Sequence, residues 1–253
     1  MRPVLGSGGR RVAAFAVGAP APLILWELIG RSHAFGAVWP PLTAVVRTML
    51  EPTGREVLLR AAAATLPQAA RGLFAGLVLG STLALVARII PALGVGFGQI
   101  AVLAQAVPII AVTPFLLTTM DRAAIPSALA AICVFFASFV SIAAGLSRAP
   151  SLYGELFRVL GASRLARLRH LDVPASIPLF LEGLRFAVPG AMVGAIVGEW
   201  FQATRGLGVV MLHTMRSGDT QMLLGSALVA SLISLAAYGA VATAQRFCRW
   251  ELT

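Results

Sequence analysis

Long apolar runs separated by short polar connections make up most of the chain. Six runs reach or approach the roughly 20 residues that a helix needs to cross a bilayer, and they cover about 12–30, 66–87, 97–117, 123–146, 178–201 and 222–244. This pattern predicts an all-α polytopic membrane protein with about six transmembrane helices. We expect a single domain over 1–253, with a core at about 60–245 and a polar loop at 150–174.

Glycine and proline punctuate two of the apolar runs. Gly72, Gly76 and Gly80 recur every four residues in the second run, and such a stripe of small residues lets two helices approach closely. Pro108 and Pro114 lie inside the third run, where they interrupt helical hydrogen bonding. We therefore expect close helix packing along the second run and a broken helix in the third.

The connection at 31–64 follows the first run. The dipeptide Pro40-Pro41 marks a turn in it, and we expect short interfacial helices at 43–50 and 56–64. Pro67 then suits the first turn of the second span.

Charged residues are rare near the later spans. Glu182 and Arg185 are one helical turn apart, so they are spaced to form an ion pair. The connection at 204–219 is predicted to be flexible because it contains Gly206 and Gly208. Glu199 lies near the far end of the fifth span, where a carboxylate is costly unless it is hydrated or paired. We expect its partner to be Arg205 or the same region of a second subunit.

The most polar stretch lies between the fourth and fifth runs and reads ELFRVLGASRLARLRHLDVP over 155–174. Apolar residues recur at helical spacing over 151–160 and predict a short amphipathic helix there. Gly161 accepts a positive φ and can end that helix, and Ser163 can cap a second one from 164 to about 171. Pro174 disfavours helix at the residue before it.

The predicted helix–turn–helix has apolar ridges and a basic rim, so it can lie in the groove of a partner protein. The alternative is an ordinary connector whose arginines only set the membrane topology.

The spacing within this stretch carries a resemblance. Glu155 is followed six residues later by Gly161, and Leu171 comes ten residues after that glycine and opens the sequence L-D-V-P. This resembles the EAA loop of ABC importer permeases, with Glu155, Gly161 and Pro174 at matching positions. Leu156 and Phe157 depart from the two small residues of that motif. The stretches 183–211 and 38–50 resemble the nitrate, sulfonate and taurine branch of the family.

The resemblance implies a cytoplasmic coupling-helix loop that docks on ABC ATPase subunits. The docking residues carried over from it are Glu155, Leu156, Val159, Gly161, Arg164, Leu171 and Pro174. It also implies a second permease subunit in a homodimer, an external solute-binding protein, and ATP bound by the partner ATPase, with no cofactor on this chain. The implied substrate is a small anion such as a sulfonate, taurine or nitrate; the alternative is a vitamin precursor, namely a thiamine pyrimidine or riboflavin.

Composition and charge agree with a multi-pass membrane protein, and the resemblance implies the inner membrane of a prokaryote. The chain is 58% hydrophobic and 12% charged, and its net charge of +10 comes from arginines spread over the connections. Membrane topology explains this charge more simply than nucleic-acid binding does. With the central loop inside, the internal connections carry eleven arginines and the external ones seven, which places both termini in the cytoplasm. A cleaved signal peptide is the alternative for the first run.

No catalytic or metal-binding pattern stands out. The chain has no Walker motif, its three histidines lie in different connections, and Cys133 and Cys248 have no metal-ligand spacing. A membrane-embedded enzyme and a substrate-capture subunit are the rival classes. Polar residues within spans are candidates for a translocation pathway or for helix–helix hydrogen bonds, and they are Gln99, Gln105, Thr113, Thr118, Glu199, Ser226 and Ser231.

Overall fold

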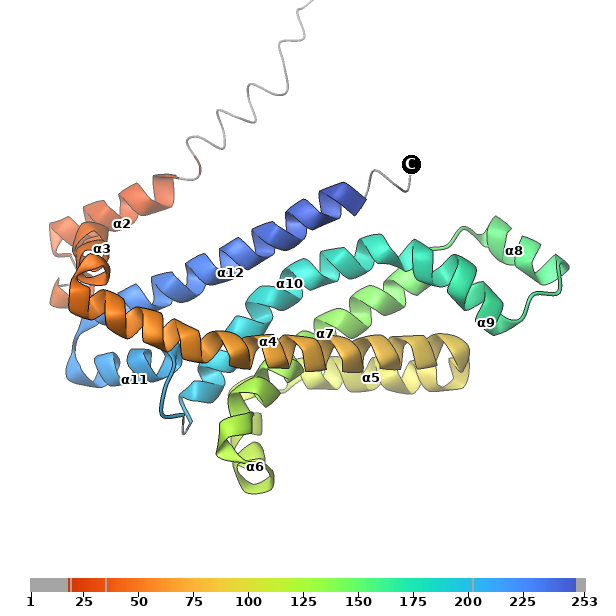
Figure 1. Ribbon diagram of the computed structural model, residues 1–253, viewed down its shortest axis with the longest axis horizontal. Helices are drawn as coiled ribbons and strands as arrows, with labels where there is room; N and C mark the ends of the chain where they lie inside the picture. The colour runs from red at the N-terminus through yellow and green to blue at the C-terminus, as the bar shows by residue number, and fades with distance from the viewer. Residues whose placement is uncertain (1–17, 19, 35, 202, 249–253) are drawn as a thin grey trace, which may run out of the picture. The chain divides into compact units, whose positions relative to one another are not determined.

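The computed structural model describes residues 18, 20–34, 36–201 and 203–248, and within these ranges every regular element is helical (Figure 1). Four helices are long and apolar enough to cross a membrane by length and composition, so the prediction of an all-α polytopic membrane protein is confirmed. The contacts divide the chain into two compact units. The first comprises the residues up to Leu59 with Val210–Ala227, and the second comprises Arg60–Val209 with the residues from Leu228 onward.

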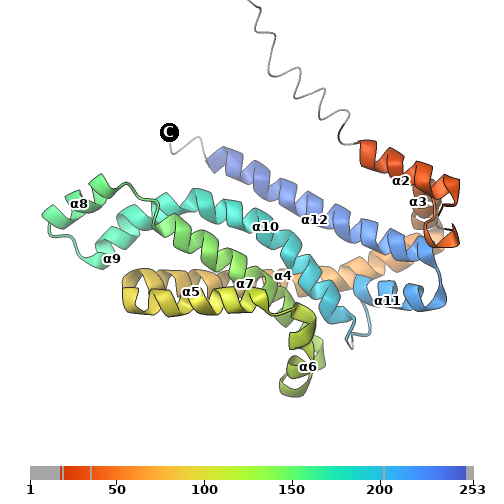
Figure 2. The same ribbon diagram turned by 180° about the vertical axis from the view of Figure 1, so that it is seen from behind.

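The second unit is built on α7 (Ile125–Leu146) and α10 (Val173–Glu199), which pack along each other and are flanked by α4 (Pro52–Ile89) and α5 (Pro91–Ala106). Figure 2 shows the same arrangement from behind. Alanine and valine side chains such as Ala130, Val134 and Ala191 fill the contact, and all three are at most 2% exposed. Small residues let the helices approach closely where lipid offers no hydrophobic driving force.

The glycine stripe on α4 packs as predicted. A Cβ added to Gly72, Gly76 or Gly80 would lie 2.3–2.8 Å from Ala130 Cβ, the Ala131 carbonyl oxygen or Ser138 Cβ of α7. These distances are too short for any side chain, so glycine is required along this contact.

The third apolar run is broken, as its prolines predicted. It forms α5 and α6 (Ile109–Thr119), with the break at Val107 and Pro108. Pro114, however, lies within α6 and does not end it. The first helix of the pair begins at Pro91, because proline suits the first turn of a helix.

Two helical predictions near the start of α4 need correction. α3 (Leu42–Leu50) matches the predicted helix at 43–50, but 56–64 is not a separate helix, because α4 runs without a break from Pro52 to Ile89. Pro67 therefore lies inside a helix and not in its first turn. The alanine run at 61–64 favours helix strongly enough to carry the chain past a single missing hydrogen bond.

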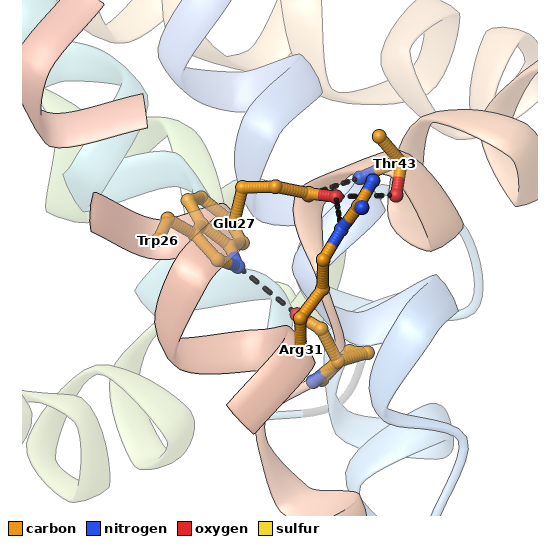
Figure 3. A network of polar contacts seen from close by, with 5 residues as sticks. Trp26, Glu27, Arg31 and Thr43 are labelled. Atoms are coloured by element: carbon orange, nitrogen blue, oxygen red, sulfur yellow. Dashed lines mark hydrogen bonds and ion pairs between the residues drawn. The ribbon is translucent and has the colours of Figure 1, made fainter. Parts of the chain in front are cut away.

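The first unit contains α2 (Pro20–Ser32), the short η1 (Gly36–Val38) and α3, held together by a polar network (Figure 3). The Glu27 carboxylate accepts hydrogen bonds from Arg31 Nε at 2.6 Å and from the Thr43 N–H at 3.0 Å. Trp26 Nε1 donates to the Pro40 carbonyl at 3.1 Å. The predicted first span, 12–30, is helical at 18 and from Pro20 onward, whereas 12–17 and 19 lie outside the described residues.

The last helices are α11 (Leu207–Ser217) and α12 (Thr220–Cys248). The second covers the predicted sixth span. The first lies in the connection that was predicted to be flexible, so that prediction was wrong: Gly206 and Gly208 are buried and lie against Glu199.

Candidate functional site

The polar loop forms α8 (Ser151–Val159) and α9 (Arg164–Arg167) at one end of α7 and α10 (Figure 1). Gly161 has φ +68° between them, and Ser163 Oγ accepts a hydrogen bond from the Ala166 N–H at 3.2 Å. The predicted helix, turn, cap and second helix are therefore all present. A Cβ at Gly161 would meet nothing within 4 Å, so only the backbone conformation requires glycine there.

Large apolar side chains on these two helices face solvent. Leu152, Val159 and Leu160 are 71–84% exposed, and Leu156 and Leu165 are 49% and 66% exposed. Glu155, Arg158 and Arg164 lie among them and are also exposed. A ridge of this kind on a charged helix pair fits the groove of a partner.

The sequence predicted that Pro174 would disfavour helix at the residue before it, but the structure is helical there. A π-helical turn, η3 (Leu168–Asp172), continues directly into α10, and Pro174 occupies the first turn of that helix. The wider π turn explains why the helix can continue through Pro174. It removes the need for an N–H at the proline, and it moves away the carbonyl that the proline ring would otherwise meet. Leu171 and Pro174 are half-buried at this junction.

Asp172 joins the loop to α4. Its carboxylate is 3% exposed and binds Arg88 with Oδ2 at 2.8 Å, and its Oδ1 lies 3.6 Å from Arg167 Nε. The Arg167 guanidinium lies over Gly154, where a Cβ would be only 3.0 Å from Nη2. The buried carboxylate thus binds the end of α4 to the loop through Arg88, and Arg167 lies between this carboxylate and α8. Sequence reasoning noted these charges but not their pairing, since they are 84 residues apart.

Glu199 closes the opposite end of α10. It is 1% exposed, and its Oε2 accepts a hydrogen bond from the Gly208 N–H at 2.7 Å, at the start of α11. The Leu207 N–H donates to Thr65 Oγ1 of α4 at 2.9 Å. The predicted partner, Arg205, is not among the bonds of Glu199 in the described part of the chain; the carboxylate instead accepts a hydrogen bond from the first turn of a helix.

The Arg185 prediction was also wrong. Its guanidinium hydrogen-bonds Gln245 at 3.1 Å and the Tyr238 hydroxyl, both on α12, and it lies 4.7 Å from the centre of the Tyr238 ring. No ion pair with Glu182 is found within the described ranges, because the tyrosine and the amide offer Arg185 a hydrogen-bonded site on the neighbouring helix.

The candidate pathway residues lie on several helices: Gln99 and Gln105 on α5, Thr113 and Thr118 on α6, Glu199 on α10, and Ser226 and Ser231 on α12. Thr113, Thr118 and Ser226 each donate a hydrogen bond to a carbonyl of their own helix. These bonds satisfy the three hydroxyls without a ligand. Among the described residues, no group of three or more potential metal ligands occurs.

Long apolar helices joined by an exposed polar helix–turn–helix define a polytopic membrane protein. The family described as "binding-protein-dependent transport system inner membrane component" matches residues 76–247, and the chain belongs to this family of transport permeases.

Named relatives agree with this assignment. The chain is 28% identical to a probable ABC transporter permease protein of Haemophilus influenzae, over 85% of this chain and 88% of the relative. It is 29% identical to the formylaminopyrimidine transport permease protein ThiX of Halalkalibacterium halodurans, over 87% and 88%. It is 24% identical to the nitrate import permease protein NrtB of Synechococcus elongatus, over 81% and 77%. The chain is thus an ABC importer permease of the binding-protein-dependent family.

Proposed function

We propose that α8 and α9 form the coupling surface of this permease, on which a partner ATPase docks and through which ATP hydrolysis drives inward transport. The observation that carries this proposal is the exposed apolar ridge on a helix pair whose turn is fixed by Gly161 and Ser163. The proposed contact residues are Glu155, Leu156, Val159, Gly161, Arg164, Leu171 and Pro174. The chain itself needs no cofactor, since the ATPase binds the nucleotide.

The rest of the assembly follows from this docking surface. The loop lies in the cytoplasm, with both termini on the same side of the inner membrane. A second copy of the chain completes the pathway, and an external solute-binding protein delivers the substrate. The whole chain acts as one permease domain, and the span residues Gln99, Gln105, Thr118 and Ser231 line the pathway. Thr113, Glu199 and Ser226 are instead buried and hydrogen-bonded within the fold.

The proposed substrate is a small anion such as a sulfonate, taurine or nitrate. The likeness to a nitrate import permease supports it. A second candidate is a vitamin precursor, which the likeness to a formylaminopyrimidine permease favours. Uptake of labelled taurine, nitrate and formylaminopyrimidine, each in competition with the others, distinguishes the two classes in cells that express the complete importer.

The docking proposal is tested by substituting Gly161 with valine. A β-branched residue is a steric outlier at φ +68°, so Gly161→Val misaligns α9 at a cost of about 1–3 kcal/mol, while the spans still insert. We expect weak ATPase pull-down and impaired transport in reconstituted vesicles. Glu155→Ala should weaken pull-down and transport less than Gly161→Val does, because it removes one polar contact and leaves the turn intact. Wild-type pull-down and transport by Gly161→Val would mean that the loop is only a connector.

A further inference from the structure

An arginine-lined cavity of about 550 Å³ lies at the end of α7 and α10 that is remote from α8 and α9. Its wall contains Arg71 of α4, Arg122 just before α7, and Arg205 just after α10. α7 runs from this cavity to the polar loop, and its 22 residues span roughly 33 Å. The cavity and the loop therefore lie at opposite ends of the same helices.

The cavity carries an excess of positive charge. Three guanidinium groups face one carboxylate, that of Asp121, which leaves two positive charges unbalanced. Within the described ranges, no ion pair involves any of these four residues. Arg71 uses Nε to bind the Pro67 carbonyl at 3.1 Å, and this bond leaves its two terminal nitrogens free to donate elsewhere. Because concave walls of one charge focus the field, the cavity attracts anions.

The chemistry of the wall is specific for oxyanions. Guanidinium groups present planar pairs of N–H donors that match sulfonate, carboxylate and phosphate oxygens. Gln68 also lines the cavity, and its buried Oε1 has no hydrogen-bond partner in the described part of the chain. The volume falls in the range of roughly 300–1,000 Å³ of small-molecule sites, so a free solute fits better than a flat protein contact.

We propose that this cavity is an anion site at the external mouth of the permease, which receives a small oxyanion such as an alkanesulfonate before it enters the pathway. The proposal rests on the cytoplasmic placement of the loop and narrows the substrate class to oxyanions. Arg71, Arg122 and Arg205 bind the anionic head of this solute.

Chemical protection of arginine tests the site directly. The permease–ATPase complex, in phosphatidylcholine nanodiscs, is treated with phenylglyoxal in the presence of methanesulfonate, and modification is mapped by mass spectrometry. We expect methanesulfonate to protect Arg71, Arg122 and Arg205, whereas Arg216 at the end of α11 reacts equally with and without it. Ethanolamine, which lacks the anionic group, should protect none of them.

A double variant supplies the second readout. In Arg122→Gln/Arg205→Gln, the methanesulfonate concentration that half-protects Arg71 should rise roughly 10–100-fold, as expected when charge-assisted hydrogen bonds are lost. Arg216→Gln is the matched control and should leave it unchanged. ATPase pull-down by each variant verifies folding, because these exposed side chains do not touch the loop.

Three outcomes would overturn the proposal: no protection by methanesulfonate, protection only by the solute-binding protein, or protection only by added phosphatidylglycerol. The second would make the cavity a docking point for acidic side chains, and the third a lipid headgroup site. Failure of the docking proposal is a separate result, since it appears as wild-type ATPase pull-down and transport by Gly161→Val and does not depend on whether methanesulfonate protects the arginines.

Discussion

Gly206 follows α10 in the loop that folds back over Glu199, and there is no space there for a side chain. Its φ is +137°, and an added Cβ would lie 2.2 Å from the Glu199 carboxylate. Gly206→Ala should therefore destabilise the permease by about 1–3 kcal/mol through strain and displacement of that carboxylate. Thermal unfolding in nanodiscs measures the effect. Gly218→Ala is the control, since Gly218 also has a positive φ but nothing within 4 Å of an added Cβ; equal unfolding temperatures would contradict the packing argument.

Glu199 also shows where reasoning from single residues stops. The sequence already indicated that a charged carboxylate at the end of a membrane span is energetically unfavourable and therefore needs a partner. The partner itself is a backbone N–H nine residues ahead, and it becomes available only because Gly206 and Gly208 allow the chain to turn tightly over the carboxylate. From the sequence alone, these two glycines predicted a flexible connection. A glycine that makes a loop flexible cannot be distinguished in the sequence from one that lets the backbone pack closely against a side chain.

At the scale of elements, local signals predicted local structure well. The loop helices, the turn at Gly161 and the Ser163 cap each depend on residues within a few positions of one another. The break at Pro108 likewise depends on a local signal, the proline itself. The errors concern continuity. α4 continues through Pro67, and η3 leads without a break into α10, whose first turn contains Pro174. The ion pair between Arg88 and Asp172 depends on the tertiary fold and was not predictable.

That ion pair should contribute measurably to the stability of the junction between α4 and the loop. Removing the buried carboxylate leaves two partly buried guanidinium groups unpaired. A double-mutant cycle with Arg88→Gln and Asp172→Asn should give a coupling energy of roughly 1–3 kcal/mol, reduced from the fully buried case because both arginines are about one-third exposed.

The matched control for this cycle is the pair of Arg47 and Glu51. Their side chains are 84% and 53% exposed and lie 3.7 Å apart, so their coupling should not exceed about 0.5 kcal/mol. Thermal unfolding of the four variants of each cycle gives both numbers. Equal coupling in the two cycles would mean that Asp172 is solvated and does not clamp the loop to α4.

At the scale of the whole molecule, the pattern of apolar runs was sufficient for the fold class, because a bilayer demands long helices and little else. The number of spans is harder to derive. The third run consists of two shorter apolar helices, while α4 extends well beyond its predicted span. Hydropathy reports where a helix is apolar, but neighbouring helices decide where it starts, breaks and ends.

The topology can be tested by cysteine labelling in intact cells. Arg88 of α4 contacts Asp172 of the loop, so the carboxyl end of α4 lies on the side of the loop. α4 has 38 residues and is roughly 57 Å long, about twice the hydrocarbon thickness, so its amino end projects from the opposite side. In a background with Cys133→Ser and Cys248→Ser, a membrane-impermeant maleimide should label Arg55→Cys but not Ser163→Cys. Ser163→Cys should label once the cells are permeabilised, because Ser163 is exposed at the tip of the loop. If Ser163→Cys labels in intact cells, the loop is external, and an ATPase could not reach it.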